Sequence, residues 1–263
     1  MAAASCGEPI GDKAETMANK IAVVTGGAGG IGKAVVSRLA QAGFDLCIAD
    51  QNEQAGQELV ELMRRQSCTA EFYQVDLRRA AEIKNLFDSI YAKFQRADVL
   101  VNLAGGTLHK HAITEFPLSQ WREVIDVNLK ATFLCCQAVS KAMRQAKSGV
   151  IINTSSNFGI TGSAGRTAYS AAKAAIVAFT KSLALELAPY GGRVNAIAPR
   201  LKATEGVRVV HTEEEWLRLS AGMPLGRAGE PRDIAEGINF LAGDDSAFMT
   251  GQLLHVNGGM VFN

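Results

Sequence analysis

The chain has 263 residues, of which 48% are hydrophobic and 20% are charged, and its formal net charge is +1. This length is enough for one sizeable α/β domain with its own core. The near-neutral charge balance gives no indication of a nucleic-acid or membrane-surface partner. The apolar runs are too short and too often interrupted for a transmembrane span. We therefore expect a globular protein without a nucleic-acid or membrane partner.

The five cysteines are odd in number and show no CxxC spacing. A disulfide framework or a zinc site is therefore not expected, and the four scattered histidines also lack metal-ligand spacing. We expect no bound metal, and a reducing cytoplasm is the default location. Residues 1–18 lack the basic and apolar regions of a secretory signal, and we expect them to form a flexible tail.

From residue 20 onward, segments typical of strands alternate with segments of helical spacing. Short apolar runs predict strands at 20–25, 44–50, 69–77, 97–105, 148–156, 192–199 and 251–259. Helical periodicity predicts helices at 33–43, 52–66, 80–94, 119–146, 167–190 and 231–243. This alternation indicates an α/β fold, a Rossmann-like doubly wound parallel sheet of about seven strands with helices on both faces. We expect it to form a single domain over 19–263.

One long irregular segment interrupts this alternation near 200–222. Loops of that length in compact domains are often lids, so we expect a lid-like segment there. The segment EEEW at 213–216, with three glutamates, is typical of the first turn of a helix, where carboxylates suit the helix dipole.

A glycine-rich turn, TGGAGGIG at 25–32, joins the first expected strand to the first helix. Its glycines permit close approach of a phosphate, and the following helix N-terminus favours an anion. The spacing Gly26-x-x-x-Gly30-x-Gly32 differs from the commoner G-x-G-x-x-G form. Because the turn follows a strand and opens a helix, we expect it to bind a nucleotide.

Asp50 ends the second expected strand, twenty residues after Gly30. A carboxylate there can accept hydrogen bonds from the adenosine ribose and would repel a 2′-phosphate. The neighbouring Gly29 and Gln51 carry no positive charge that could hold such a phosphate. We therefore expect NAD(H) in preference to NADP(H). In the alternative interpretation, Asp50 only caps the loop.

Tyr169 and Lys173 are four residues apart, and Ser156 comes thirteen residues before Tyr169. Residues at i and i+4 share one face of a helix. A tyrosine is a poor acid or base at neutral pH, but a nearby ammonium favours the phenolate and lowers its pKa. The pair therefore predicts proton transfer at a carbonyl or an alcohol.

Together these features resemble the short-chain dehydrogenase/reductase family over about residues 19–259. The resemblance rests on TGGAGGIG, NLAG at 102–105, Asn128 in VNL, Ser156 and YSAAK, in this order. It implies that Tyr169 is the catalytic acid/base and that Ser156 polarises the carbonyl oxygen. It also implies that Lys173 lowers the pKa of the tyrosine and holds the nicotinamide ribose, while Asn128 helps to hold a water molecule.

The resemblance further implies contacts to the cofactor. Besides the glycine turn and the strand-end aspartate, these contacts include a pair of residues beside the adenine and a segment beneath the cofactor. They also include an isoleucine near the pyrophosphate and a threonine at the nicotinamide amide. The expected cofactor-binding residues are Gly26, Gly30, Ile31, Gly32, Asp50, Asp76, Leu77, Asn102, Ala104, Gly105, Tyr169, Lys173, Pro199 and Thr204. One departure is Arg200, which follows Pro199 where the family usually has glycine.

The implied activity is NAD-dependent hydride transfer between the nicotinamide and a secondary alcohol or ketone, in a homotetramer or dimer. One alternative is a 3-oxoacyl-[acyl-carrier-protein] reductase, although such reductases mostly use NADPH. Another is a non-catalytic dinucleotide sensor on the same fold. Arg166, Arg200 and His109 could favour an anionic substrate. We favour the interpretation that the arginines are solvated, because exposed charge is the usual state.

Overall fold

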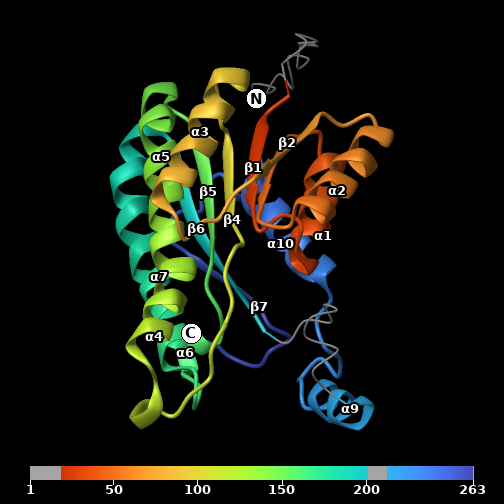
Figure 1. The fold of residues 1–263 in the computed structure, drawn as a ribbon. Helices are drawn as coiled ribbons and strands as arrows, with labels where there is room; N and C mark the ends of the chain where they lie inside the picture. The colour runs from red at the N-terminus through yellow and green to blue at the C-terminus, as the bar shows by residue number, and fades with distance from the viewer. Residues whose placement is uncertain (1–18, 201–211, 263) are drawn as a thin grey trace, which may run out of the picture.

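The computed structural model describes residues 19–200 and 212–262 (Figure 1). These residues form a parallel sheet of seven strands in the order β3-β2-β1-β4-β5-β6-β7. The strands are β1 (Ile21–Thr25), β2 (Asp45–Asp50), β3 (Ala70–Gln74), β4 (Val99–Asn102), β5 (Gly149–Thr154), β6 (Gly192–Pro199) and β7 (Leu253–Val256). The expected fold class is confirmed. The order of the strands turns back between β1 and β4, and such a switch point is where open α/β sheets bind ligands.

Helices cover both faces of the sheet (Figure 1). One face carries α1 (Gly30–Gln41), α2 (Glu53–Arg65) and α10 (Pro231–Ala242). The other carries α3 (Ala80–Phe94), α5 (Ala131–Ala146) and α7 (Thr167–Leu187). Three shorter helices lie beyond the carboxyl ends of the strands, namely α4 (Leu118–Ile125), α6 (Phe158–Thr161) and α9 (Glu213–Ala221).

The central strands are buried on both faces, which explains their continuous apolar sequences. All five residues of β1 are buried, and successive side chains of a strand point to opposite faces. Val23 therefore belongs to the core beneath α3 and α5, while Val24 belongs to the core beneath α1 and α10. The sheet is thus held rigidly from both sides, and the loops at its carboxyl edge are positioned by this frame.

Several elements differ from the sequence-based expectations. The expected helix at 119–146 is divided into α4, a π-helical segment Asp126–Lys130 and α5. The strand expected at 97–105 ends at Asn102, because the chain leaves the sheet there and Gly105 takes a φ of +142°. The first helix begins inside the glycine turn, at Gly30.

The expected tail at 1–18 and residues 201–211 of the lid-like segment lie outside the described residues. The segment EEEW at 213–216 does begin a helix, as expected. Thr212 caps α9, and its hydroxyl accepts a hydrogen bond from the Glu215 backbone N–H. The described residues include no helix that is long and apolar enough to cross a bilayer.

Candidate active site

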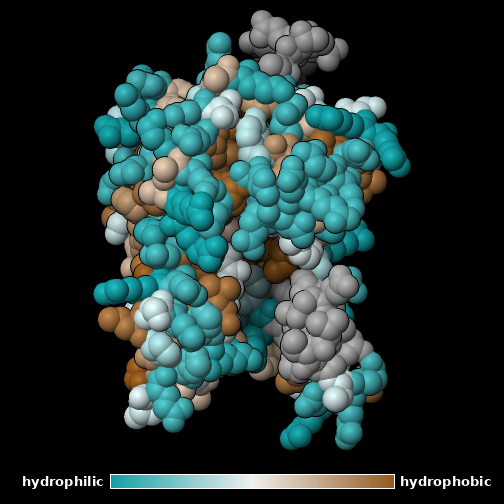
Figure 2. Space-filling view, viewed as in Figure 1, coloured by the Kyte–Doolittle hydropathy of each residue, from teal (hydrophilic) through white to brown (hydrophobic). Residues whose placement is uncertain are grey.

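A cleft of about 370 Å³ lies at the carboxyl ends of β1, β2 and β4. Figure 2 shows the molecule recessed between its two helical sides, with hydrophobic residues visible inside the recess. The cleft is lined by Gly26, Gly29, Gly30, Ile31, Gly32, Asp50, Gln51, Val75, Asp76, Leu77, Arg78, Leu103, Ala104, Gly105, Leu108 and Val127. Four loops that are distant in sequence therefore meet here, and they contain most of the expected cofactor contacts.

The glycine turn is shaped so that side chains cannot occupy it. Gly26 has a φ of +68°, and a Cβ atom on it would lie 2.8 Å from the backbone nitrogen of Ala104. A Cβ atom on Gly32 would lie 2.2 Å from the carbonyl oxygen of Gly26. The N-terminus of α1 therefore faces the cleft without covering side chains. Its free N–H groups can bind a phosphate there. This cradle fits the pyrophosphate of a dinucleotide.

Asp50 lies in this cleft and also fixes the glycine turn. One carboxylate oxygen accepts a hydrogen bond of 3.1 Å from the Ala28 N–H, and the other accepts one of 3.1 Å from the Asn52 N–H. Asp50 therefore has a structural role in this loop, as the alternative interpretation expected, while the claim that it has only this role stays a prediction. The structural role does not remove the residue from the cleft, because Asp50 lines the same wall as Gly30.

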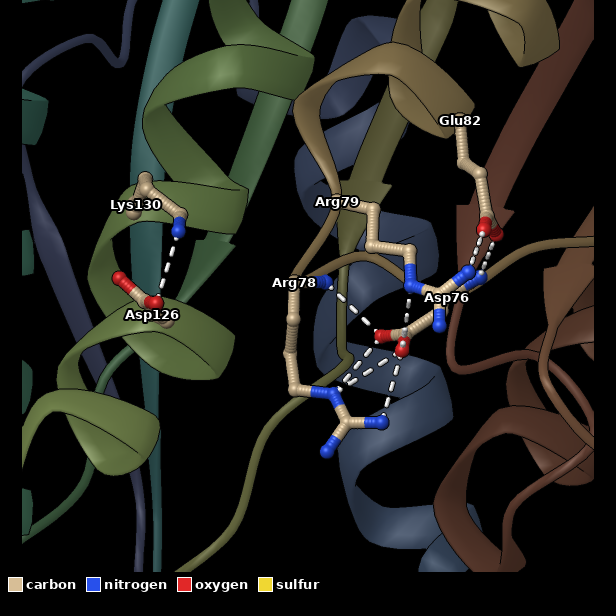
Figure 3. A network of polar contacts seen from close by, with 6 residues as sticks. All are labelled: Asp76, Arg78, Arg79, Glu82, Asp126 and Lys130. Atoms are coloured by element: carbon tan, nitrogen blue, oxygen red, sulfur yellow. Dashed lines mark hydrogen bonds and ion pairs between the residues drawn. The ribbon is translucent and has the colours of Figure 1, made fainter. Parts of the chain in front are cut away.

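Asp76 is the centre of an ionic network at the far end of the cleft (Figure 3). The guanidinium of Arg78 binds both of its carboxylate oxygens, at 2.7–3.1 Å, and Arg79 lies 3.7 Å away. The hydrogen bond from Arg78 holds the pKa of Asp76 below its usual range. Glu82 accepts a hydrogen bond of 2.7 Å from the Asp76 N–H, and it forms an ion pair with Arg79. Lys130 pairs separately with Asp126 at 2.8 Å.

Arg78 is a cleft residue that sequence reasoning missed. Its signal was present, because it directly follows the expected adenine-side pair Asp76 and Leu77. A cation therefore lines the cleft next to the residues expected to contact the adenine. Its charge is already engaged by the bidentate pair with Asp76, which is a strong arrangement for an arginine.

The remaining expected contacts are placed differently. The side chain of Asn102 points into the core, where its amide donates to Asn153 Oδ1 at 3.0 Å and to Cys136 Sγ at 3.4 Å. It therefore supports the loop rather than lining the cleft. Pro199 ends β6, and its carbonyl accepts a hydrogen bond from the Asn157 N–H. Thr204 lies outside the described residues.

Ser156, Tyr169 and Lys173 are brought together from two elements. Ser156 follows β5, and the other two residues lie one turn apart on α7. Ser156 lies close enough to Tyr169 to lower the pKa of the tyrosine by hydrogen bonding. The Nζ atom of Lys173 lies 5.6 Å from the centroid of the tyrosine ring. The expected triad is therefore assembled in space.

The electrostatics of the triad differ from the expectation. Burial raises the pKa of Tyr169, while the hydrogen bond from Ser156 and the charge of Arg166 lower it. Burial also lowers the pKa of Lys173 to about 7. The expectation that the Lys173 ammonium lowers the tyrosine pKa is therefore not met in this structure. A buried lysine that bonds only a carbonyl loses much of its charge near neutral pH.

Asn128 completes the site from the π-helical segment. Its amide donates hydrogen bonds of 2.9 Å to the carbonyl oxygens of Gly106 and Val124, and its Oδ1 accepts one of 3.1 Å from the Gly106 N–H. A Cβ atom on Gly105 would lie 2.4 Å from that oxygen and 3.4 Å from Lys173 Nζ. Asn128 and Lys173 therefore flank the loop that lines the cleft. π-Helical turns often mark functional sites.

Comparisons with known proteins decide the family. A family model described as Enoyl-(Acyl carrier protein) reductase matches residues 26–261. The chain is 38% identical to the 3-oxoacyl-[acyl-carrier-protein] reductase FabG of Chlamydia pneumoniae, over 94% of this chain and 99% of that protein. The chain belongs to the short-chain dehydrogenase/reductase family. The expected resemblance and an oxidoreductase function are thereby confirmed.

Members of this family with different substrates are similarly close. The chain is 35% identical to a cyclopentanol dehydrogenase of Comamonas sp., over 93% of this chain and 98% of that protein. It matches the crystal structure of an NAD⁺-bound xylitol dehydrogenase with a TM-score of 0.87 at 31% identity, over 93% of this chain and 100% of that one. The family binds a nicotinamide dinucleotide, which agrees with the cradle described above. The described residues contain no cluster that could hold a metal ion.

Proposed function

We propose that this short-chain dehydrogenase/reductase transfers hydride between NAD(H) and a secondary alcohol or ketone, with Tyr169 as the acid/base. The observation that carries this proposal is the assembly of Ser156, Tyr169 and Lys173 where α7 meets the end of β5, with the Lys173 Nζ atom 5.6 Å from the centroid of the Tyr169 ring. The link to the cleft runs through Lys173, whose Nζ atom lies against Gly105 in the cleft wall. Proton transfer and cofactor binding therefore share one site.

The two hydroxyls have complementary tasks. A bound nicotinamide dinucleotide supplies the hydride chemistry. Tyr169 accepts the hydroxyl proton of the substrate in oxidation and returns a proton in reduction. Ser156 donates a hydrogen bond to the same substrate oxygen, where negative charge accumulates. Because Ser156 is close enough to Tyr169 to lower its pKa, we expect one substrate oxygen to lie within reach of both side chains.

Lys173 and Asn128 support this proton transfer without contacting the substrate oxygen. With a pKa of about 7, Lys173 can gain or lose a proton near neutral pH, and we propose that it also holds the nicotinamide ribose. Asn128 binds both polar backbone groups of Gly106 and so fixes the loop between Lys173 and the cleft. We assign to it the role of keeping a proton path open between the lysine and solvent.

The preference for NAD over NADP rests on charge. Asp50 places a carboxylate in the wall next to the glycine turn, and a 2′-phosphate there would meet like charge. The cation in the same cleft, Arg78, is engaged by Asp76. An added phosphate would therefore have to break that pair to gain a partner.

A second candidate is reduction of 3-oxoacyl groups on a carrier protein, because curated relatives at 38% identity carry that name.

For assembly we propose a homotetramer or dimer that pairs the α5 and α7 faces. Phe133 on α5 stays 43% exposed there while it contacts Phe179 on α7. The free cysteines Cys47, Cys68 and Cys135 suit a reducing compartment, and we propose the cytoplasm.

The test is an assay of the purified full chain with NADH and with NADPH. Small cyclic, linear and hydroxylated ketones are compared with an acetoacetyl thioester, and oxidation of the nicotinamide is followed. We expect turnover of simple ketones with NADH at lower KM than with NADPH. Turnover restricted to the thioester with NADPH would support the second candidate. No turnover of any substrate with either cofactor would contradict both and favour a dinucleotide sensor.

A further inference from the structure

Two arginines face the same aromatic ring next to the proposed catalytic groups. The Cζ atom of Arg166 lies 5.1 Å from the centroid of the Phe158 ring, and that of Arg200 lies 4.7 Å from it. The three residues come from separate places, because Phe158 opens α6, Arg166 precedes α7 and Arg200 follows β6. The fold thus gathers two positive charges around one ring.

This arginine pair is tied to the reacting hydroxyls. The backbone N–H of Phe158 donates a hydrogen bond of 3.2 Å to the Oγ atom of Ser156. Arg166 precedes Tyr169 by three residues at the start of α7, and its charge lowers the pKa of that tyrosine. An anionic group held by the pair would therefore lie within a few bonds of a carbon that reacts at Ser156 and Tyr169.

Neither arginine forms an ion pair with a described residue. Arg166 donates one hydrogen bond, of 2.9 Å, to the Ser163 hydroxyl, whereas Arg227 and Arg78 elsewhere in the chain each bind a carboxylate. Burial and the charge of Arg166 both lower the pKa of Arg200. An arginine nevertheless stays protonated, so two half-buried like charges lie close enough to interact unfavourably. A bound anion would relieve this repulsion.

We propose that Arg166 and Arg200 bind a carboxylate of the substrate, so that the reacting carbon belongs to a hydroxy acid or an oxo acid. The planar guanidinium matches a carboxylate with two parallel hydrogen bonds. From the sequence we favoured solvated arginines. In the structure both arginines are instead half-buried against Phe158. The third expected member, His109, is separate, since it pairs with Glu123 at 2.8 Å.

This inference rests on the proposed function and specifies its substrate class. The secondary alcohol carbon gives its hydride to NAD⁺, the hydroxyl proton passes to Tyr169 and then to solvent, and a ketone and NADH result. The carboxylate takes no part in bond making. Its binding to the two arginines determines which alcohol carbon is placed next to Tyr169.

The test compares hydroxy acids of four to six carbons with their methyl esters, each as the substrate with NAD⁺. We expect the ratio of kcat/KM for an acid to that for its ester to fall about 10- to 100-fold in Arg200→Gln and in Arg166→Gln, as for loss of a charged hydrogen bond. Most of the fall in Arg200→Gln should lie in the KM of the acid, and Arg200→Lys should recover part of it. Arg65→Gln, at a side chain that is 79% exposed, serves as the control with an unchanged ratio.

Three outcomes would overturn the inference while the proposed function stands. In the first, the arginine variants affect acids and esters equally. In the second, Arg200→Gln raises the KM of NAD⁺ instead of the KM of the acid, which would assign the cation to the cofactor. In the third, the wild type prefers esters or neutral alcohols. Turnover of neither class with either cofactor would overturn the proposed function and this inference together.

Discussion

The Nζ atom of Lys173 donates a hydrogen bond of 2.8 Å to the carbonyl oxygen of Thr154, the last residue of β5. The hydroxyl of Ser155 donates one of 2.8 Å in return, to the carbonyl oxygen of Lys173. Ser156 directly follows Ser155 in the chain, and Tyr169 lies one helical turn before Lys173. These two hydrogen bonds therefore connect the segments that carry Ser156 and Tyr169. The two reacting hydroxyls are thus held together by the docking of α7 against the end of β5.

The buried ammonium of Lys173 should make stability depend on pH. Its pKa is about 7 in the folded protein, whereas a lysine in the unfolded chain titrates near ~10.4. Between these values the unfolded state binds more protons, so the free energy of unfolding rises with pH, by up to about 1.4 kcal/mol per pH unit. Lys173→Met removes this contribution. Urea unfolding at several pH values from 7 to 10 measures the difference in slope.

A matched control is Lys141→Met, because Lys141 is exposed on α5. It should keep the wild-type slope. If Lys173→Met also keeps the wild-type slope, then Lys173 is not held near neutral pKa in the folded protein, and its proposed role in proton transfer loses its basis.

Asn128→Ala should both destabilise the protein and slow turnover. The side chain is fully buried, and its loss leaves the Gly106 backbone groups and the Val124 carbonyl without three hydrogen bonds. Leaving buried polar groups unpaired costs about 1–3 kcal/mol each. We expect a loss of at least about 2 kcal/mol in the free energy of unfolding, measured with urea, and a lower kcat under conditions where the variant remains folded. Gln57→Ala, at an exposed position of α2, should change neither quantity.

Asp50→Asn tests the charge argument for the cofactor. Removing the carboxylate charge should improve NADP⁺ binding relative to NAD⁺, by about tenfold for a relief of repulsion near 1.4 kcal/mol. Dissociation constants of both dinucleotides, measured by fluorescence titration, give the ratio. Asp45→Asn, at the opposite end of β2, should leave the ratio unchanged. An unchanged ratio in Asp50→Asn would remove the physical basis of the proposed NAD preference.

Gly32→Ala tests the phosphate cradle. The new Cβ atom would lie 2.2 Å from the carbonyl oxygen of Gly26, so the turn or α1 must shift. We expect dinucleotide binding, measured by calorimetry, to fall at least about tenfold, with a loss of stability. Gly243→Ala provides the comparison, because its Cβ atom would make only ordinary contact, at 3.4 Å from Asn239. Equal dinucleotide affinity in the two variants would show that the turn is not the cradle.

The sequence predicted the sheet well because its signals are local. Continuous apolar runs such as that of β1 follow from burial on both faces, and this burial leaves few other possibilities. The glycines at 26 and 32 were also predictable, since a strand followed by such a turn and a helix restricts the backbone strongly. Strand ends were less accurate. The segment after Asn102 keeps an apolar sequence but leaves the sheet to line the cleft.

The features that escaped prediction depend on contacts between distant segments. The partner of Lys173 is a carbonyl at the end of β5, and burial at this position lowers the pKa of the lysine. The pair of Arg78 with Asp76 requires the loop geometry after β3. The stacking of Arg200 on Phe158 joins residues 42 positions apart in the sequence. Periodicity and spacing carry no information about such pairings.

Turnover of Tyr169→Phe is the most direct measure of the proposed proton transfer. The substitution removes only the phenolic oxygen, and it leaves the ring beside Lys173 and the fold of α7 in place. With the best substrate found for the wild type and saturating NAD⁺ or NADH, we expect kcat to fall about 100- to 10,000-fold, while the variant still folds and binds the dinucleotide. Turnover at the wild-type rate by a Tyr169→Phe protein that binds cofactor would contradict the assignment of Tyr169 as the acid/base.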